Sequence, residues 1–298
     1  MFVPVRHSSQ HDVVGLRNSV LHPLESFMKT RYLSLIILLL SSSGVAIAQT
    51  TATDYFNRAV ANQRAGKLDL AIADYTKAIE LDPRYFDAYI ERSSLRMLRK
   101  DYDGAVADDD KALEIQPNNL DTLCESGIAR SAKGDYDGAI AHYTRANELN
   151  PTYERPLILR GEARGLKKDF PGALADFAKV IEINPNDSGY YSSRGKVRHD
   201  MADYKGAIAD YTKSIELLPS FSLTYCERGD VRRDSGDLEG AVADYTKAIE
   251  VDLFDPQCYR NRAKAYRMMK KIDLAVADEK KAANIDRLKA LEKSGPEM

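Results

Sequence analysis

Hydrophobic and polar residues follow one another along this chain with the period of helices that bury one face. In residues 204–217 the apolar and small side chains recur at intervals of three and four, at Tyr204, Ala207, Ile208, Tyr211, Ser214 and Ile215. That spacing puts them on a single stripe of an amphipathic helix. A matching stripe occupies residues 191–198, and a short polar break separates the two segments. The pattern therefore predicts a hairpin of two helices.

The hairpin pattern occurs seven times with a period of 34 residues and without insertions. The period is visible in one alanine of the second helix, which recurs at Ala71, Ala105, Ala139, Ala173, Ala207, Ala241 and Ala275. The seven units run from Ala52 to Lys289, and we number the positions in each unit as places, with Ala52 at place 1. Place 8 is always small: Ala59, Ser93, Gly127, Gly161, Gly195, Gly229 and Ala263. Repeats of this length predict hairpins that stack and bury their apolar faces against one another.

Glycine, aspartate and proline mark where the predicted helices begin and end. In the break Lys133-Gly134-Asp135, Gly134 permits a tight turn and Asp135 can cap the helix that follows. Proline ends a helix because it lacks an N–H and clashes with the preceding turn. It stands at place 32 of the first five units, at Pro83, Pro117, Pro151, Pro185 and Pro219. We expect the small residue at place 8 to let the two backbones of a hairpin approach closely.

These residues resemble the tetratricopeptide repeat family, whose 34-residue unit has a small residue in the first helix, alanine and aromatics in the second and a closing proline. The match is clearest in residues 67–83 and 206–219. The resemblance covers residues 52–289 and implies an all-α fold. Its architecture would be an α-solenoid, a right-handed superhelix of seven stacked 34-residue helix hairpins. The first helices would line a concave groove and the second helices would lie outside it.

Two units depart from the repeat pattern. Unit seven has Glu279 at place 24, where an aromatic residue is expected, and it lacks the closing proline. We expect its last helix to run from about Ile272 to Lys293 and to serve as a polar cap, with residues 290–298 forming the end of that helix and a short tail. Unit two has Asp109 at place 24, so we expect its hairpin to be locally weaker.

Two rows of arginine in the first helices recur in step with a row of aspartate in the second helices. The arginines lie at place 7 (Arg58, Arg92, Arg160, Arg194, Arg228, Arg262) and place 11 (Arg96, Arg130, Arg164, Arg198, Arg232), and the aspartates at place 23 (Asp74, Asp108, Asp176, Asp210, Asp244, Asp278). An arginine ladder can bind phosphate or another polyanion. Because the acidic row accompanies the basic one and arginine pairs well with carboxylates, we instead expect ion pairs across each hairpin that set its register.

In this family the concave surface comes mainly from places 2, 5, 9, 12 and 13, and these places change character along the chain. In units one to four they are mostly apolar, and the expected peptide-binding residues are Phe56, Val60, Ile90, Met97, Ile128 and Ile158, with Cys124 and Leu166 beside them. In units five to seven the expected residues are Lys196, Arg233, Arg260, Lys264 and Arg267, with His199, Asp200, Asp230 and Asp234 nearby.

Such a groove complements a protein or peptide ligand with an apolar segment next to acidic residues. The alternative is that the apolar residues only pack between neighbouring first helices while the charged ones are solvated.

The N-terminal region has the pattern of a secretory signal peptide at residues 28–48. Basic residues Lys29 and Arg31 precede an apolar run, and small residues end in Ala46-Ile47-Ala48. The run is shorter than the ~20 apolar residues of a membrane span and is interrupted by serines. We therefore expect cleavage near Ala48 rather than an uncleaved anchor, no stable membrane span afterwards, and a secreted or periplasmic product. Residues 1–27 read as an extended or wrongly started N-terminus.

Composition and charge narrow the function further. The 298 residues include 43 Lys+Arg, 45 Asp+Glu and 44% hydrophobic residues, which is typical of a soluble globular protein. The net charge of −2 argues against nucleic-acid binding, which needs a basic surface. The five histidines are too scattered for a multi-histidine metal site, and the chain has no phosphate-binding glycine loop or nucleophile elbow. We therefore predict no catalytic residues, no metal and no cofactor.

The chain has three cysteines, and Cys226 and Cys258 fall in adjacent first helices. Stacked helices lie about 8–10 Å apart, whereas a disulfide needs Cα atoms within about 7 Å. We expect buried free thiols, although an oxidising compartment leaves a disulfide between these two open.

These patterns predict a non-enzymatic, exported protein–protein interaction scaffold that binds a peptide or protein segment in its concave groove. The alternative is a homo-oligomeric structural spacer or assembly factor of the cell envelope. In that case a second copy of the chain would cover the apolar part of the groove.

Overall fold

The computed structural model describes residues 50–293 of the chain. The expected N-terminal extension and signal peptide lie outside the described residues, as does the tail at 294–298. From Tyr55 onward these residues belong to one compact unit.

Residues 50–293 form helices and contain no strand. The first helices of the hairpins are α2 (Ala52–Arg64), α4 (Phe86–Leu98), α6 (Leu120–Lys133), α8 (Glu154–Leu166), α10 (Ser188–Asp200), α12 (Ser222–Ser235) and α14 (Pro256–Met268). The second helices are α3 (Leu68–Leu81), α5 (Tyr102–Ile115), α7 (Tyr136–Leu149), α9 (Phe170–Ile183), α11 (Tyr204–Leu217), α13 (Leu238–Val251) and α15 (Ile272–Lys293). The predicted all-α solenoid of helix hairpins is confirmed, and α15 has the predicted bounds.

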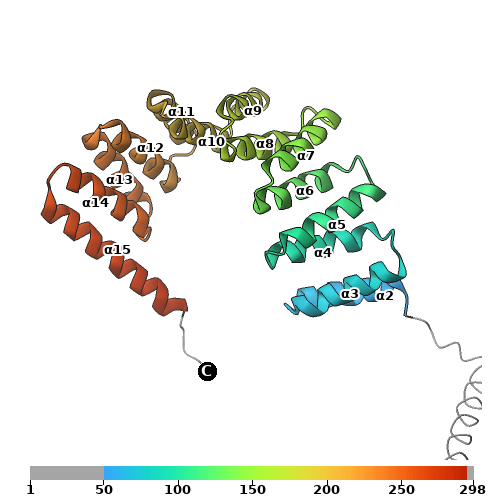
Figure 1. The fold of residues 1–298 in the computed structure, drawn as a ribbon. Coiled ribbons are helices and arrows are strands. Elements are labelled where there is room, and N and C mark those ends of the chain that lie inside the picture. The colour runs from blue at the N-terminus through green and yellow to red at the C-terminus, as the bar shows by residue number, and fades with distance from the viewer. Residues whose placement is uncertain (1–49, 294–298) are drawn as a thin grey trace, which may run out of the picture. The chain divides into compact units, whose positions relative to one another are not determined.

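The hairpins stack in chain order, from α4 and α5 to α14 and α15 (Figure 1). Each second helix packs against the first helix of the next hairpin, as α5 packs against α6 and α7 against α8. Neighbouring first helices also contact one another from α6 to α14, whereas no two neighbouring second helices of the described chain pack to that extent. We call the layer formed by these helices the first-helix face.

The predicted breaks and caps are present. Gly134 ends α6 with a left-handed φ of +90°, and Asp135 accepts a hydrogen bond from the Gly138 N–H at 3.0 Å at the start of α7. Four further second helices are capped by aspartate in this way, by Asp101, Asp169, Asp203 and Asp237. Second helices that precede a place-32 proline end two residues before it, as α11 ends at Leu217 before Pro219.

The small residue at place 8 makes room for an aromatic side chain. A Cβ built on Gly127 would lie 2.3 Å from the ring of Tyr143, and one on Gly229 would lie 2.7 Å from the ring of Tyr245. Both rings are buried at place 24 of the second helix. A larger side chain at place 8 would therefore have to displace this ring, and the expected close approach of the two backbones stays a prediction. The ring of the second helix, rather than its backbone, fills the space left at place 8.

The predicted ion pairs across each hairpin are confirmed in six of the seven units. In unit five the Arg194 Nε and Nη2 donate to the Asp210 carboxylate at 3.0 and 2.7 Å, and the Arg198 Nη1 donates to it at 2.7 Å. Asp210 is only 3% exposed. The guanidinium groups of these arginines are thus paired with aspartates of the same hairpins. In the described chain the arginine rows are therefore not a free ladder for a polyanion.

Several place-7 arginines also join neighbouring hairpins, which sequence reasoning missed. The Arg92 Nη1 donates to the Thr76 Oγ1 of the preceding second helix at 2.9 Å. Equivalent bonds link Arg160 to Thr144, Arg228 to Thr212 and Arg262 to Thr246. The recurring threonine at place 25 was the available signal.

Candidate peptide-binding groove

The first two expected groove residues pack between hairpins one and two. The ring of Phe56 stacks on Tyr85 with centroids 4.9 Å apart and lies 5.5 Å from the ring of Tyr75. Val60 packs against the same buried cluster. At this end of the first-helix face the apolar side chains therefore stabilise the stack, and each remains partly exposed.

The apolar residues of units two to four have different surroundings. Ile90 and Met97 line a cavity of about 190 Å³ between α4, α5 and α6. Ile158 packs against the buried cluster that contains Phe177, and Ile128 is half-buried on α6. Cys124 is fully buried, so it offers nothing to a ligand on the surface.

A cavity of about 400 Å³ opens between α8 and α10, where the apolar and the charged parts of the expected groove meet. Its apolar lining includes Leu166, Phe177 and Val197, and its polar lining includes Glu162, Gly165, Ser193, Lys196 and Asp200. Leu166 is 59% exposed. Cavities that bind ligands typically measure ~300–1,000 Å³ and combine apolar walls with a few polar groups. The structure thus brings Lys196 and Leu166 together in a hollow of suitable size.

The five expected cations differ in whether the protein already neutralises them. Arg233 pairs with Asp230 at 2.7 Å and with Asp234 at 2.9 Å. Arg260 pairs with Asp286, and Arg267 donates two 2.8 Å hydrogen bonds to Glu279. In contrast, Lys196 and Lys264 form no ion pair within residues 50–293, and Lys264 makes only a 3.5 Å contact to Asn261. Lys196 nevertheless lies near Glu162 and Glu227, where its charge opposes the rise in pKa that burial causes in both carboxyls.

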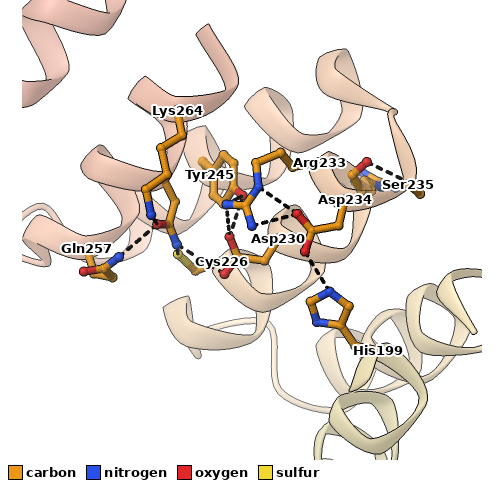
Figure 2. Close-up of polar contacts among 11 residues, drawn as sticks. His199, Cys226, Asp230, Arg233, Asp234, Ser235, Tyr245, Gln257 and Lys264 are labelled. Carbon is orange, nitrogen blue, oxygen red and sulfur yellow. Dashed lines mark hydrogen bonds and ion pairs between the residues drawn. The ribbon is translucent and has the colours of Figure 1, made fainter. Parts of the chain in front are cut away.

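A polar network on the first-helix face joins hairpins five, six and seven (Figure 2). The Asp230 carboxylate accepts hydrogen bonds from the Tyr245 hydroxyl at 2.7 Å and the Arg233 Nη1 at 2.7 Å. The Asn261 Nδ2 also donates to it, at 3.2 Å. Burial and the charge of Asp230 raise the pKa of Tyr245, so its hydroxyl stays protonated and donates. The His199 Nε2 lies 3.0 Å from the Asp234 Oδ2.

This network holds four helices in one arrangement: α10, α12, α13 and α14. From the sequence, Asp230 and Asp234 were expected only to reduce the positive charge of the surface around them. The i, i+3 spacing of Asp230 and Arg233 was the available signal for the first of these ion pairs, whereas Asp234 follows Arg233 directly and its contact depends on side-chain direction.

All three cysteines are free thiols and are buried. Cys226 and Cys258 belong to one hydrophobic cluster. The Cys258 Sγ donates to the Asp255 Oδ2 at 3.2 Å, and the Asn261 Nδ2 lies 3.9 Å from the Cys226 Sγ. The expected buried free thiols are confirmed, and the pair is not bridged.

Among residues 50–293 no three His, Cys, Asp or Glu side chains are grouped so that they could hold a metal ion. Within the same residues no helix has the length and apolar character needed to span a bilayer.

Three segments of the chain match models of the tetratricopeptide repeat. Residues 52–85 and 120–153 each match a model described as a tetratricopeptide repeat, and residues 229–270 match one described as a TPR repeat. The first two segments coincide with units one and three. The chain therefore contains tetratricopeptide repeats, as its resemblance to that family predicted. No curated protein sequence matches the chain.

Solved structures of tetratricopeptide repeat proteins share this fold. A tetratricopeptide repeat protein from Parabacteroides merdae ATCC 43184 is similar with a TM-score of 0.67 and 18% identity, over 78% of this chain and 93% of that one. YrrB, described as a TPR protein with an unusual peptide-binding site, is similar with a TM-score of 0.52 and 23% identity, over 61% and 94%. MamA is similar with a TM-score of 0.50 and 24% identity, over 55% and 96%. At these identities the likeness concerns the fold.

Proposed function

We propose that this protein is an exported, non-enzymatic scaffold that binds a peptide or protein segment on its first-helix face. The observation that carries the proposal is the cavity of about 400 Å³ between α8 and α10. Leu166 and Val197 supply apolar surface there, and Lys196, which lies near Glu162 and Glu227 but forms no ion pair within residues 50–293, supplies a cation. An apolar side chain next to an acidic one in the ligand fits this combination.

The comparisons support a binding role. Tetratricopeptide repeats typically form interaction surfaces rather than catalytic sites, which supports the non-enzymatic part. YrrB is described by its peptide-binding site, and this makes a peptide the first class of ligand to test. Export rests on the signal-peptide pattern at residues 28–48 alone.

The binding test uses the full chain and a library of displayed random peptides. A selected peptide is expected to bind with a dissociation constant of about 1 μM, roughly −8 kcal/mol. Lys196→Glu reverses the charge of this side chain and is expected to weaken peptide binding at least tenfold. The matched control is Lys205→Glu on α11, because Lys205 is also exposed and belongs to the same hairpin. This variant is expected to bind within twofold of the wild type.

Two results would contradict the binding proposal. One is a library that yields no peptide with saturable binding. The other is a selected peptide that binds the Lys196→Glu and Lys205→Glu variants equally well, since the ligand would then lie away from the cavity between α8 and α10.

The export test is the mass of the protein recovered from a secreting bacterial host. Cleavage near Ala48 predicts a mature chain that begins at Gln49. A product that retains residues 28–48 would contradict export by cleavage without bearing on peptide binding.

A further inference from the structure

The second hairpin lacks the aromatic ring that fills the inside of its neighbours. Place 24 holds a buried ring in five units, at Tyr75, Tyr143, Phe177, Tyr211 and Tyr245. In unit two that place holds Asp109, which is 1% exposed. Neither carboxylate oxygen of Asp109 has a hydrogen-bond partner among the described residues. A buried carboxylate without a partner is strongly disfavoured, because it loses the solvation that water provides.

The donors near Asp109 are engaged elsewhere. The Ser93 hydroxyl, which lies at place 8 of the same hairpin, donates to the Ala105 carbonyl oxygen at 3.3 Å. Arg92 and Arg96 donate to the preceding residue, Asp108. The three consecutive aspartates thus differ in their partners. Asp110 pairs with an arginine of the next hairpin, whereas the Asp109 carboxylate has no hydrogen-bond partner among the described residues. Burial, together with the nearby acids, raises the pKa of Asp109 to about 7, while the neighbouring Ser93 hydroxyl opposes this rise.

The missing ring leaves a cavity of about 190 Å³. Its lining consists of Ile90, Ser93, Ser94 and Met97 from α4, Asp109 from α5 and Glu125 from α6. Ile90, Ser94 and Met97 are places 5, 9 and 12 of unit two, which are groove places, and Ser94 is exposed. The cavity therefore opens on the first-helix face. Ile90 and Met97 line the way from this opening to the Asp109 carboxyl, which in its ionised form can only accept hydrogen bonds.

We propose that this cavity is a subsite for a basic side chain of the bound segment, lysine or arginine. The ammonium or guanidinium group would donate to the Asp109 oxygens, and its aliphatic stem would lie along Ile90 and Met97. The assignment rests on the proposed function and adds a specificity to it. An apolar or aromatic guest could fill the space but would leave the Asp109 oxygens unpaired. An acidic guest would add a third negative charge beside those of Asp109 and Glu125.

The distribution of charge supports a cation. Glu125 at the rim is already paired with Arg155 of hairpin four, so the negative charge without a partner in the cavity is that of Asp109. Charge-assisted hydrogen bonds to a carboxylate are about twice as strong as neutral ones. A basic side chain would supply the donors that the fold itself does not.

The test uses small probes and the full chain at pH 8, where the Asp109 carboxyl is ionised. The probes are n-butylammonium for the lysine side chain, n-propylguanidinium for the arginine side chain and n-butanol as the uncharged control. Binding is followed through the NMR signals of the Ile90 and Met97 methyl groups. At least one cationic probe is expected to shift them saturably, with a dissociation constant of roughly 1–10 mM, and to bind at least tenfold more tightly than n-butanol.

Three variants complete the test. Asp109→Asn keeps the shape of the side chain and is expected to weaken cation binding at least tenfold. Asp87→Asn removes an exposed carboxylate from α4, the helix that carries Ile90 and Met97, and is expected to leave binding unchanged. Ser94→Trp changes an exposed residue at the opening and is expected to block entry even if Asp109→Asn were to alter the fold.

These outcomes decide whether the cavity binds a basic side chain, and they do not depend on the result of the peptide-binding test. The tighter of the two cationic probes identifies lysine or arginine as the guest. No saturable shift with either cation, equal binding of n-butanol, or unchanged binding in the Asp109→Asn variant would each overturn the proposal. Because the probes need no peptide, they report on this subsite whether or not the display library yields a ligand.

Discussion

Arg130 donates two hydrogen bonds from its Nη2 to the carboxylate of Asp110, at 2.7 and 2.8 Å, and joins hairpin three to hairpin two. Unit three is the one described hairpin without the recurring ion pair, because place 7 holds Ser126 and place 23 holds His142. Arg130 therefore lacks its usual aspartate. It reaches instead to place 25 of the preceding unit, where several other units have threonine and unit two has Asp110.

This pair is expected to couple the two hairpins energetically. A double-mutant cycle with Arg130→Ala and Asp110→Ala should give an interaction energy of about 1 kcal/mol at low salt, because the pair is charge-assisted but partly exposed. The interaction should shrink in 1 M salt, where the screening length falls to about 3 Å. The measurement is urea unfolding at both salt concentrations. If the two single substitutions lower the free energy of unfolding by amounts that simply add in the double variant, the Arg130–Asp110 pair does not stabilise the contact between hairpins two and three.

The buried aspartates of place 23 should matter far more than surface charges. Asp210→Ala leaves Arg194 and Arg198 without their carboxylate, and we expect it to lower the free energy of unfolding by ~3–5 kcal/mol. The control is Glu216→Ala, which removes an exposed partner of Lys213 on the same helix. It is expected to change stability by about 0.5 kcal/mol or less. Equal losses in the two variants, measured by urea unfolding, would refute the difference between buried and exposed pairs.

The Asp109 carboxyl should make the protein less stable as pH rises. Its pKa of about 7 in the folded chain lies above the ordinary value of 3.8, so the folded state holds more protons than the unfolded state between these values. Stability therefore falls as pH rises through this window. The difference corresponds to roughly 4 kcal/mol at most.

Asp109→Asn is expected to remove that dependence. The melting temperatures of the wild type and the variant should be closest near pH 4 and should differ most near pH 8, with the variant more stable. Glu227, whose pKa burial also raises to about 7, is present in both proteins, so their difference isolates Asp109. A difference that stays constant from pH 4 to pH 8 would contradict a buried, titrating Asp109.

Ala202 is held in a left-handed conformation, with φ at +63°, in the turn between α10 and α11. Glycine adopts this conformation without strain from a Cβ. Ala202→Gly is therefore expected to stabilise the protein by ~0.5–1 kcal/mol. The same replacement inside a helix should act in the opposite direction, and Ala175→Gly, at an exposed position of α9, is expected to destabilise by about 1 kcal/mol. Thermal unfolding compares the two, and a loss of stability in both would argue against strain at Ala202.

Much of the fold was predictable because every unit repeats the same local sequence pattern. The spacing of apolar residues gave the hairpins, and the place-32 prolines gave the ends of the second helices. Ser294-Gly295-Pro296 predicted that the last helix would reach about Lys293, and the described helix α15 extends to Lys293. The pairing of Arg194 with Asp210 followed from two charged rows with one period.

The candidate site was harder to predict, because its properties depend on contacts between units. Three of the expected groove cations are paired within the protein, and the carboxylates of Asp286 and Glu279 come from α15, whose side-chain directions the repeat pattern does not specify. In the sequence, Asp109 stands where an aromatic residue is expected, and this predicted only a locally weaker hairpin. Only the packed structure shows that the space stays open as a cavity instead of being filled by a neighbouring side chain. The list of groove residues itself remains a prediction.

Amide hydrogen exchange of the full chain, with and without a saturating peptide from the display selection, tests the central claim most directly. The account predicts slower exchange in α8 and α10 when the peptide is bound, with little change in the second helices α9 and α11. Slower exchange confined to α9 and α11 would contradict the claim that the first-helix face binds the ligand.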